Sequence, residues 1–431
     1  MRSFYHVLIN SLIANVTISF LWFALVFWVY LETKSVLATG IIGGAYMLFV
    51  AITSIFFGTI VDHHKKKQVF VVSSAITLAF FALAGVLYTL QPASELLQLT
   101  NPTFWLFIGV ILLGAIVGNV RNIALSTIVT LLVPKDQRAN ANGLAGTVGG
   151  IGFIVTSVFS GLAIGMLGMG WVLVIAIVIM AVALVHIWFV AIPEEGIVHD
   201  PELAKKKVDL RGSVAAISAV PGLFALLLFS TFNNLIGGVY MALLDPYGLT
   251  LFSVEMWGIL FGVAGTGFVV GGLIIAKWGL GKNPVKTLLG VVIAMGFIGA
   301  LFTIREWPWL LAIGLWLYMV ITPAIEAAEQ TVIQRVVPYE RQGRVFGFAQ
   351  AFESAAAPIT SFLIAPLAEF WIIPYVNSDA GQASLGWLLG AGEARGIALV
   401  FLFSGVLISV VAACAFLTKS YRRLSESYRN A

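Results

Sequence analysis

The stretch QVFVVSSAITLAFFALAGVLYTL, residues 68–90, contains no charged residue and directly follows the basic run Lys65, Lys66 and Lys67. A transmembrane helix needs about 20 consecutive, mainly apolar residues. A strand of a membrane β-barrel would instead alternate apolar and polar residues over about 10 positions, and this stretch does not alternate. It therefore predicts a membrane-spanning α-helix that begins beside a cluster of cations.

Comparable apolar runs recur along the whole chain and predict an all-α membrane protein with twelve transmembrane helices. The composition agrees, because 60% of the residues are hydrophobic and only 10% are charged, whereas soluble domains carry about 25% charged residues. A soluble globular fold is therefore excluded. The other predicted spans are 5–31, 36–60, 104–131, 141–168, 170–192, 216–244, 254–277, 287–304, 308–333, 345–373 and 396–418.

The distribution of Lys and Arg predicts which ends of these spans face the cytoplasm. Cytoplasmic loops of membrane proteins carry an excess of both residues. With the N-terminus inside, nearly all of them fall in cytoplasmic segments, Arg121 lies within a span, and only Lys34, Arg305 and Arg395 fall outside. Both termini are therefore expected to be cytoplasmic, in a multi-pass protein of the inner or plasma membrane.

The two halves of the sequence repeat one another. The loop VPKDQR at 133–138 corresponds to VPYERQ at 337–342, and a glycine follows each loop at the same distance, Gly143 and Gly347. Likewise, GTIVD at 58–62 corresponds to GLIIA later in the chain. Parallel repeats of this kind are typical of one large class of transporters.

A polar stretch that contains the run Lys205, Lys206 and Lys207 separates the two halves. We therefore expect an N-terminal six-helix bundle at 1–192, a cytoplasmic linker at 193–215, and a C-terminal six-helix bundle at 216–431. The two bundles are expected to be pseudo-symmetric.

Gly58 and Asp62, followed by Lys65 and further basic residues, resemble the cytoplasmic signature loop of the major facilitator superfamily. The loop at 133–138 and the sequence QGRVFG at 342–347 are similar to bacterial drug-efflux branches of that superfamily. The resemblance covers nearly the whole chain. It implies the superfamily's fold and secondary active transport.

The resemblance also implies a role for the acid of this loop. In the superfamily it faces the start of span eleven and pairs with a cytoplasmic cation, so Asp62 is expected to pair with Arg344 or Arg138 and to stabilise the state closed to the cytoplasm. A carboxylate near a helix N-terminus is favourable by about 0.3–1 kcal/mol. In the second copy of the loop Ala276 replaces the acid, so only the first half keeps a charged pair.

Ionisable residues deep within spans are the strongest functional candidates. An acid or an arginine in mid-membrane costs about 2.5–3.5 kcal/mol on insertion scales, so such residues normally face a cavity or a partner. Arg121 lies roughly 20 Å, Glu326 roughly 18 Å and Glu353 roughly 14 Å from the cytoplasmic ends of their helices. Glu329 and Gln330 share the helix face of Glu326 through i, i+3 and i+4 spacing.

Two interpretations of these residues stay open. In the functional one, Glu326 and Glu353 bind and release protons, because burial disfavours an ionised carboxyl and a nearby guanidinium favours it. In the other, Arg121 and Glu326 form a static pair that joins the two halves. Neutral polar residues in spans one and seven could bind substrate, or could join helices at about 0.6 kcal/mol each: Asn15, Ser19, Asn233 and Asn234.

Motifs of enzymes and ATPases are missing from the sequence. Around Lys282 a phosphate-binding loop would need Gly and Ser or Thr where Ala276 and Asn283 stand, and Cys414 is the only cysteine. We expect no enzymatic activity, no cofactor, no metal site and no nucleic-acid partner.

The combined hypothesis is a monomeric, proton-coupled antiporter in the lipid bilayer that exports hydrophobic or cationic small molecules, as in multidrug or antibiotic efflux. The alternative is an importer or facilitator of a specific metabolite, siderophore or lipid-like compound.

Overall fold

The computed structural model describes residues 2–33, 36–194, 210–390, 392 and 394–431. Throughout this part of the chain the secondary structure is helical, with no strand. Eleven of its helices are long and apolar enough to cross a membrane. The predicted all-α membrane fold is therefore confirmed. The run Lys205 to Lys207 lies outside the described residues.

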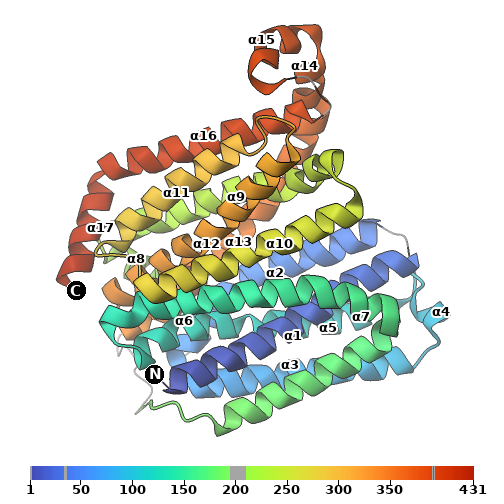
Figure 1. Ribbon diagram of the computed structural model, residues 1–431. Coiled ribbons are helices and arrows are strands. Elements are labelled where there is room, and N and C mark those ends of the chain that lie inside the picture. The colour runs from blue at the N-terminus through green and yellow to red at the C-terminus, as the bar shows by residue number, and fades with distance from the viewer. Residues whose placement is uncertain (1, 34–35, 195–209, 391, 393) are drawn as a thin grey trace. The chain divides into compact units, whose positions relative to one another are not determined.

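The first half begins with three long helices and continues through a helix that is interrupted at Asn119. The long α7 contains Gly168, whose φ of 77° and ψ of 171° are not helical, so α7 consists of two consecutive helices. Eleven candidate spans, one of them double, are consistent with twelve. The elements in Figure 1 are α1 (Arg2–Thr33), α2 (Val36–His63), α3 (Lys66–Thr89), α4 (Ala93–Leu96), α5 (Pro102–Gly118), α6 (Val120–Leu132), η1 (Lys135–Gln137) and α7 (Arg138–Phe189).

In the second half the main differences from the predicted spans are in span seven, expected at 216–244, and at the start of span eleven, expected at 345 and observed at Tyr339. A span from 216 is wrong: a short helix ends at Ser218 and α9 begins at Leu223. Between them Gly222 has a φ of 88°, which favours glycine, and it occupies the N-cap position of α9. The elements are α8 (Leu210–Ser218), α9 (Leu223–Leu251), α10 (Val254–Trp278), α11 (Pro284–Leu301), α12 (Pro308–Val336), α13 (Tyr339–Leu367), the π-helix η2 (Ala368–Ile372), α14 (Ile373–Asn377), α15 (Asp379–Leu389), α16 (Arg395–Leu417) and α17 (Lys419–Asn430).

Short polar side chains determine where several helices begin. The side chain of Asn101 accepts a hydrogen bond from the backbone N–H of Thr103, and Pro102 occupies the first turn, where its missing N–H has no helical partner. Asn283 caps α11 in the same way, again with a proline following. These caps place the chain reversals between apolar runs at the positions that the sequence predicts.

The chain divides into two compact units. Unit 1 comprises 1–135, 151–214 and 338–351, and unit 2 comprises 136–150, 215–337 and 352–431. Thus the first turns of α13 pack with unit 1, and the first turns of α7 pack with unit 2. These two exchanged segments carry several of the predicted functional residues.

Packing within each unit follows the pattern of membrane helices. In unit 1 an aromatic core forms around Trp28, Phe81 and Phe107. In unit 2, α11 packs against α12 and against α16, and Figure 1 shows α11 beside α16. Gly296 of α11 and Gly405 of α16 bring the two backbones so close that a side chain at either position would overlap the other helix. Small residues at such contacts allow helices to associate in lipid.

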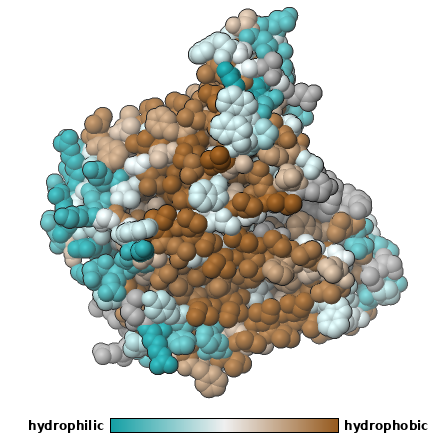
Figure 2. All heavy atoms as spheres, viewed as in Figure 1, coloured by the Kyte–Doolittle hydropathy of each residue, from teal (hydrophilic) through white to brown (hydrophobic). Residues whose placement is uncertain are grey.

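The outer surface of the helices is apolar. Large hydrophobic side chains such as Phe189 and Phe362 are exposed by 80% and 81%. Figure 2 shows hydrophobic residues along the sides of the helices and hydrophilic residues near helix ends, including α17. A surface of this kind is stable in lipid and not in water.

Candidate functional site

The predicted signature loop contacts the exchanged segment of α13 within unit 1. Asp62, in the last turn of α2, is buried, and its Oδ1 accepts a hydrogen bond from the backbone N–H of Gly343 at 2.6 Å. Its Oδ2 accepts from the backbone N–H and the Nε of Arg344, each at 3.0 Å. Arg344 is also buried, so the two charges form an ion pair away from solvent.

Gly58 explains how the two helices come this close. A Cβ at Gly58 would lie 2.5 Å from the backbone oxygen of Gly343 and 3.0 Å from the Cα of Arg344. Only a residue without a side chain leaves room for that backbone. The spacing of Gly58 and Asp62, one helical turn apart, therefore combines a close approach with a carboxylate directed at the same segment.

The second copy of this contact is present in unit 2 without charge. Asn140, which corresponds to Arg344 in the repeat, donates from Nδ2 to the backbone oxygen of Ala276 at 2.7 Å. Gly272, the counterpart of Gly58, lies against Thr147, whose backbone nitrogen would be 2.5 Å from a Cβ there. The same helix contact therefore occurs twice, once with an ion pair and once with a neutral hydrogen bond.

The other predicted cations of this region have different partners. Arg138 is buried and donates from Nη1 to the backbone oxygen of Gln334 at 2.7 Å, within unit 2. Lys65 is half-buried and occupies the N-cap position of α3, without a capping side-chain bond. Of the two candidates for Asp62, Arg344 is therefore the cation that contacts it.

A second ion pair at this end of unit 1 was missed by the sequence reasoning. Lys66 Nζ lies 3.6 Å from Glu194 Oε1, and the Lys66 backbone N–H donates to Glu194 Oε2 at 2.7 Å. Tyr339, the first residue of α13, donates from its hydroxyl to Glu194 Oε1 at 3.3 Å. Glu194 thereby joins the start of α3, the start of α13 and the chain that leads into the linker. The usable signal was an acid directly after the last apolar residues of span six.

Three carboxyl groups lie near one another on α12 and α13 of unit 2. Glu329 is buried, and Ser230 of α9 donates from Oγ to its Oε2 at 2.5 Å. Glu329 and Glu353 are joined by a side-chain hydrogen bond. Two carboxyl groups in such contact form a hydrogen bond only when one of them carries a proton. Oε1 of Glu353 is buried without a hydrogen-bond partner.

Glu326 differs from its two neighbours because its side chain is exposed. It lies one turn before Glu329 on α12 and interacts electrostatically with it. Since an exposed carboxylate in the middle of a spanning helix is costly against lipid, this side chain requires a wet or ligand-accessible environment. The cluster thus combines a pair of carboxyl groups, one buried and one half-buried, with one exposed acid.

The predicted polar residues of spans seven and ten surround this cluster. Asn234 donates from Nδ2 to the backbone oxygen of Ser230 at 3.0 Å, which fixes the turn of α9 that carries the Ser230 hydroxyl. Asn233 is half-buried, and its Oδ1 has no hydrogen-bond partner. Gln330 is half-buried beside Glu329. Ser230 was not predicted, because a single serine in an apolar run is common.

Arg121 has its partners in unit 1. Its side chain is 1% exposed and donates from Nη1 to the backbone oxygen of Phe70 at 3.2 Å, and also to the Ser74 hydroxyl. Nη2 donates to Oδ1 of Asn10, whose amide reaches the ring of His186 at 3.2 Å. All of these hydrogen-bond acceptors are neutral oxygens, so the guanidinium retains its positive charge inside unit 1.

Asn15 of α1 belongs to a row of polar side chains in unit 1. It donates from Nδ2 to Oδ1 of Asn122 at 2.9 Å, Asn122 donates to Oδ1 of Asn119 at 3.1 Å, and Asn119 donates to the hydroxyl of Tyr46 at 3.3 Å. Ser19, one turn after Asn15, is half-buried. Asn119 and Asn122 were missed, although both lie beside Arg121 in the sequence.

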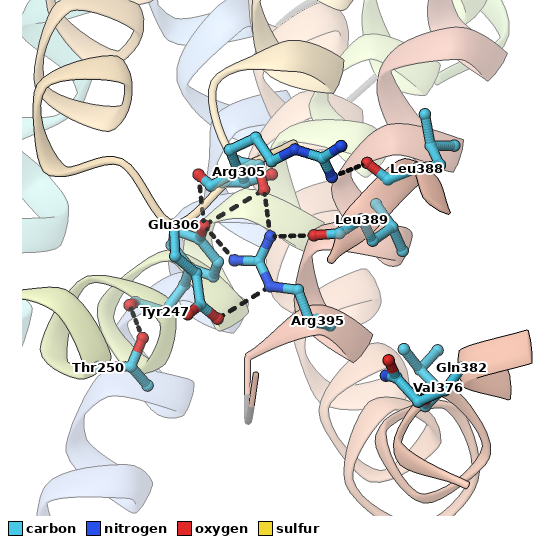
Figure 3. Close-up of polar contacts among 10 residues, drawn as sticks. Tyr247, Thr250, Arg305, Glu306, Val376, Gln382, Leu388, Leu389 and Arg395 are labelled. Atoms are coloured by element: carbon cyan, nitrogen blue, oxygen red, sulfur yellow. Dashed lines mark hydrogen bonds and ion pairs between the residues drawn. The ribbon is translucent and has the colours of Figure 1, made fainter. Parts of the chain in front are cut away.

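A polar network centred on Arg395 joins the ends of several unit 2 helices. Arg395, the first residue of α16, is fully buried and donates to Glu306 Oε1 at 2.9 Å and to the Tyr247 hydroxyl at 2.7 Å. It also donates to the backbone oxygens of Thr303 and Leu389, each at 3.1 Å. Figure 3 shows these bonds converging on one guanidinium. The connection before α12 and the end of α15 are thereby held to α9 and α16.

Together, the helices and these buried polar groups define a multi-pass α-helical membrane protein of the transporter type. The family model described as Major Facilitator Superfamily matches residues 7–361. The chain belongs to the major facilitator superfamily, and it is a transporter rather than an enzyme.

Solved transporter structures share this fold at low sequence identity. A bacterial homologue of the iron transporter ferroportin in its outward-facing state is 15% identical, with a TM-score of 0.70, covering 97% of this chain and 100% of that one. The human organic anion transporter MFSD10 (TETRAN) is 17% identical, with a TM-score of 0.66, covering 94% and 99%. The proton:xylose symporter XylE is 12% identical, with a TM-score of 0.61, covering 94% of both chains.

No curated protein matches the chain in a sequence search. The solved structures include transporters of an ion, of organic anions and of a sugar. Their likeness therefore defines the fold of this chain, and it does not identify the substrate.

Proposed function

We propose that this protein is a monomeric, proton-coupled secondary transporter of the cell membrane that exports hydrophobic or cationic small molecules by alternating access. The observation that carries this proposal is the pairing of the Glu329 and Glu353 carboxyl groups inside a spanning bundle, where the two groups can share a proton. Ser230 supports the pair from α9.

The shared proton supplies a physical basis for coupling. If the pair lost its proton, two negative charges would face each other away from bulk water, which is strongly unfavourable. A positive charge on an arriving substrate, or entry of water, would relieve that repulsion. Glu326 is the acid that such a substrate meets first, because it is the exposed member of the cluster. Proton binding and cation binding would then exclude one another, which is the requirement of an antiporter.

The contact of Asp62 with Arg344 supplies a candidate conformational switch. We assign to it the role expected from the superfamily, in which it stabilises the state closed to the cytoplasm. The buried ion pair resists opening, because separating the two groups leaves each charge without its partner. Each transport cycle would therefore break and re-form this contact.

The alternative function, import or facilitated passage of a specific metabolite, siderophore or lipid-like compound, is favoured by one observation. The row from Asn15 to Tyr46 is neutral and suits hydrogen bonds to a polar, uncharged cargo. The direction of transport separates the two functions. Accumulation of a fluorescent cationic dye in inverted vesicles that contain the protein supports export, and loss of dye from them supports import.

Coupling is tested in proteoliposomes with an imposed proton gradient. We expect dye transport to follow the gradient in the wild type, and to lose that dependence in E329Q and E353Q, because an amide keeps the shape and a hydrogen bond but exchanges no proton. E426Q, which changes an exposed glutamate of α17, is the matched control and keeps its dependence. Wild-type transport that is indifferent to collapse of the gradient would refute the proposal.

A further inference from the structure

Span four passes from α5 to α6 at Asn119, whose φ of −63° and ψ of −23° remain helical. α5 ends at Gly118, α6 begins at Val120, and the amide of Asn119 lies at the junction. Asn119 is roughly 22 Å along the helix from Pro134, well inside a bilayer. Polar side chains at this depth normally face a cavity or a hydrogen-bond partner.

Hydrogen-bond donors remain available at this junction. The amide oxygens of Asn122 and Asn119 are each occupied by the preceding amide N–H, and the hydroxyl oxygen of Tyr46 accepts from Asn119. Each amide has a second N–H, and the Tyr46 hydroxyl has a proton to donate. Of these residues Asn122 is exposed and Asn119 and Tyr46 are half-buried, so their remaining donors can be reached.

Trp22 adds an unsatisfied donor to the same place. Its indole ring lies 5.2 Å from the ring of Tyr46, and its Nε1–H is buried without a hydrogen-bond partner. A buried donor without a partner is unfavourable by about 1–3 kcal/mol, so it marks a position where an acceptor is expected to bind. The two rings also supply an apolar aromatic surface beside the donors.

The local charge favours the same kind of ligand. Arg121 lies two residues after Asn119 in sequence, and its hydrogen bonds go to neutral acceptors. Its positive charge is therefore not cancelled by an acid among its hydrogen-bond partners, and the potential near the junction attracts electron-rich atoms. A hydrocarbon lipid chain cannot satisfy these donors.

We propose that Trp22, Tyr46 and Asn122 form a binding site in unit 1 for an aromatic molecule that carries oxygen acceptors, such as carbonyl, carboxylate or sulfonate groups. The ring stacks against Trp22 and Tyr46, and the oxygens accept from the indole, phenol and amide donors. The inference rests on the proposed function only in taking such a molecule as cargo. It adds a chemical requirement that the carboxyl cluster of unit 2 does not supply.

Two dyes with one aromatic skeleton test this site. Anilinonaphthalene sulfonate carries oxygen acceptors, and phenylnaphthylamine has the same rings without the sulfonate. Binding of each is measured by fluorescence titration of the full protein in lipid nanodiscs, with empty nanodiscs subtracted. We expect the wild type to prefer the sulfonate dye. W22F and Y46F keep a ring and remove one donor, and each is expected to weaken sulfonate binding by roughly tenfold, as for one lost hydrogen bond to a charged group.

The same substitutions should leave the affinity for phenylnaphthylamine unchanged. W171F is the matched control, since Trp171 of unit 1 is 62% exposed on the helix surface, and it should bind both dyes like the wild type. Equal losses for both dyes would show a structural role only, and unchanged sulfonate binding would show that no such site exists; either result overturns the proposal. Because binding is measured without a gradient, this result is independent of proton coupling and transport direction.

Discussion

Arg344 donates to a single carboxylate oxygen of Asp62 from two of its nitrogens, the backbone N–H and Nε, each at 3.0 Å. The side chain and the backbone of Arg344 thus hold the carboxylate of Asp62 in place. The second copy of the contact keeps the geometry and loses the charge, since Asn140 donates to the backbone of Ala276. The duplication therefore preserved the approach of the helices and confined the ion pair to one copy.

The D62N substitution should destabilise the protein strongly. It leaves the buried Arg344 without a counter-charge, and removal of one partner of a buried ion pair costs about 3–5 kcal/mol. The midpoint of thermal unfolding in detergent should fall. D136N, at an exposed acid, serves as the control and should unfold like the wild type. Equal midpoints for D62N and the wild type would contradict the importance of the ion pair.

The neutral copy of this helix contact should contribute less to stability than the charged copy. N140A removes one hydrogen bond to a backbone oxygen, for which a loss of about 0.5–1.5 kcal/mol is expected. Measured in the same unfolding assay, its effect should be clearly smaller than that of D62N. A larger effect would mean that the charged copy is not the stronger of the two contacts.

The G58A substitution should disturb the same contact through packing. An added methyl group would meet the backbone of Gly343 and Arg344, and overpacking of this kind costs about 1–3 kcal/mol. G161A is a suitable comparison, because no atom lies within 4 Å of a Cβ at that position. A gain in protease sensitivity near residue 343 in G58A, and none in G161A, is the expected outcome of limited proteolysis.

The R395M substitution should release the segment that carries α15. It removes the partner of Glu306 and leaves the backbone oxygens of Thr303 and Leu389 with one donor fewer. We expect a loss of about 3–5 kcal/mol and faster hydrogen exchange across 379–389. R422M changes an exposed arginine of α17 and should exchange like the wild type there. Unaltered exchange in R395M would exclude the network as the anchor of α15.

Much of the fold could be predicted from local sequence. Apolar length determines a spanning helix, because every backbone group in lipid must bond within its own segment. Caps such as Asn101 and Asn283, each followed by proline, mark helix starts in any context. Span seven was misplaced because the run of mostly apolar residues continues through 216–222, although Pro221 and the left-handed Gly222 separate α8 from α9.

The candidate residues could be named from the sequence, but their partners could not. Glu326, Glu329 and Glu353 stand out as acids in apolar runs. The sequence does not indicate that Glu329 bonds to Glu353 and Ser230 while Glu326 stays exposed, because that depends on how α9, α12 and α13 are rotated. For the same reason, the sequence does not indicate that Asn119 and Tyr46 lie in one row.

The sequence by itself determined the class of protein, the repeat and the identity of the costly buried charges, since these follow from solvent and helix geometry along one segment. The tertiary structure alone decided which charges meet: Asp62 with Arg344, Lys66 with Glu194 and Arg395 with Glu306. The physical reason is that pairing depends on how closely two helices approach. That approach is set by packing at positions such as Gly58, far from its partner in the chain.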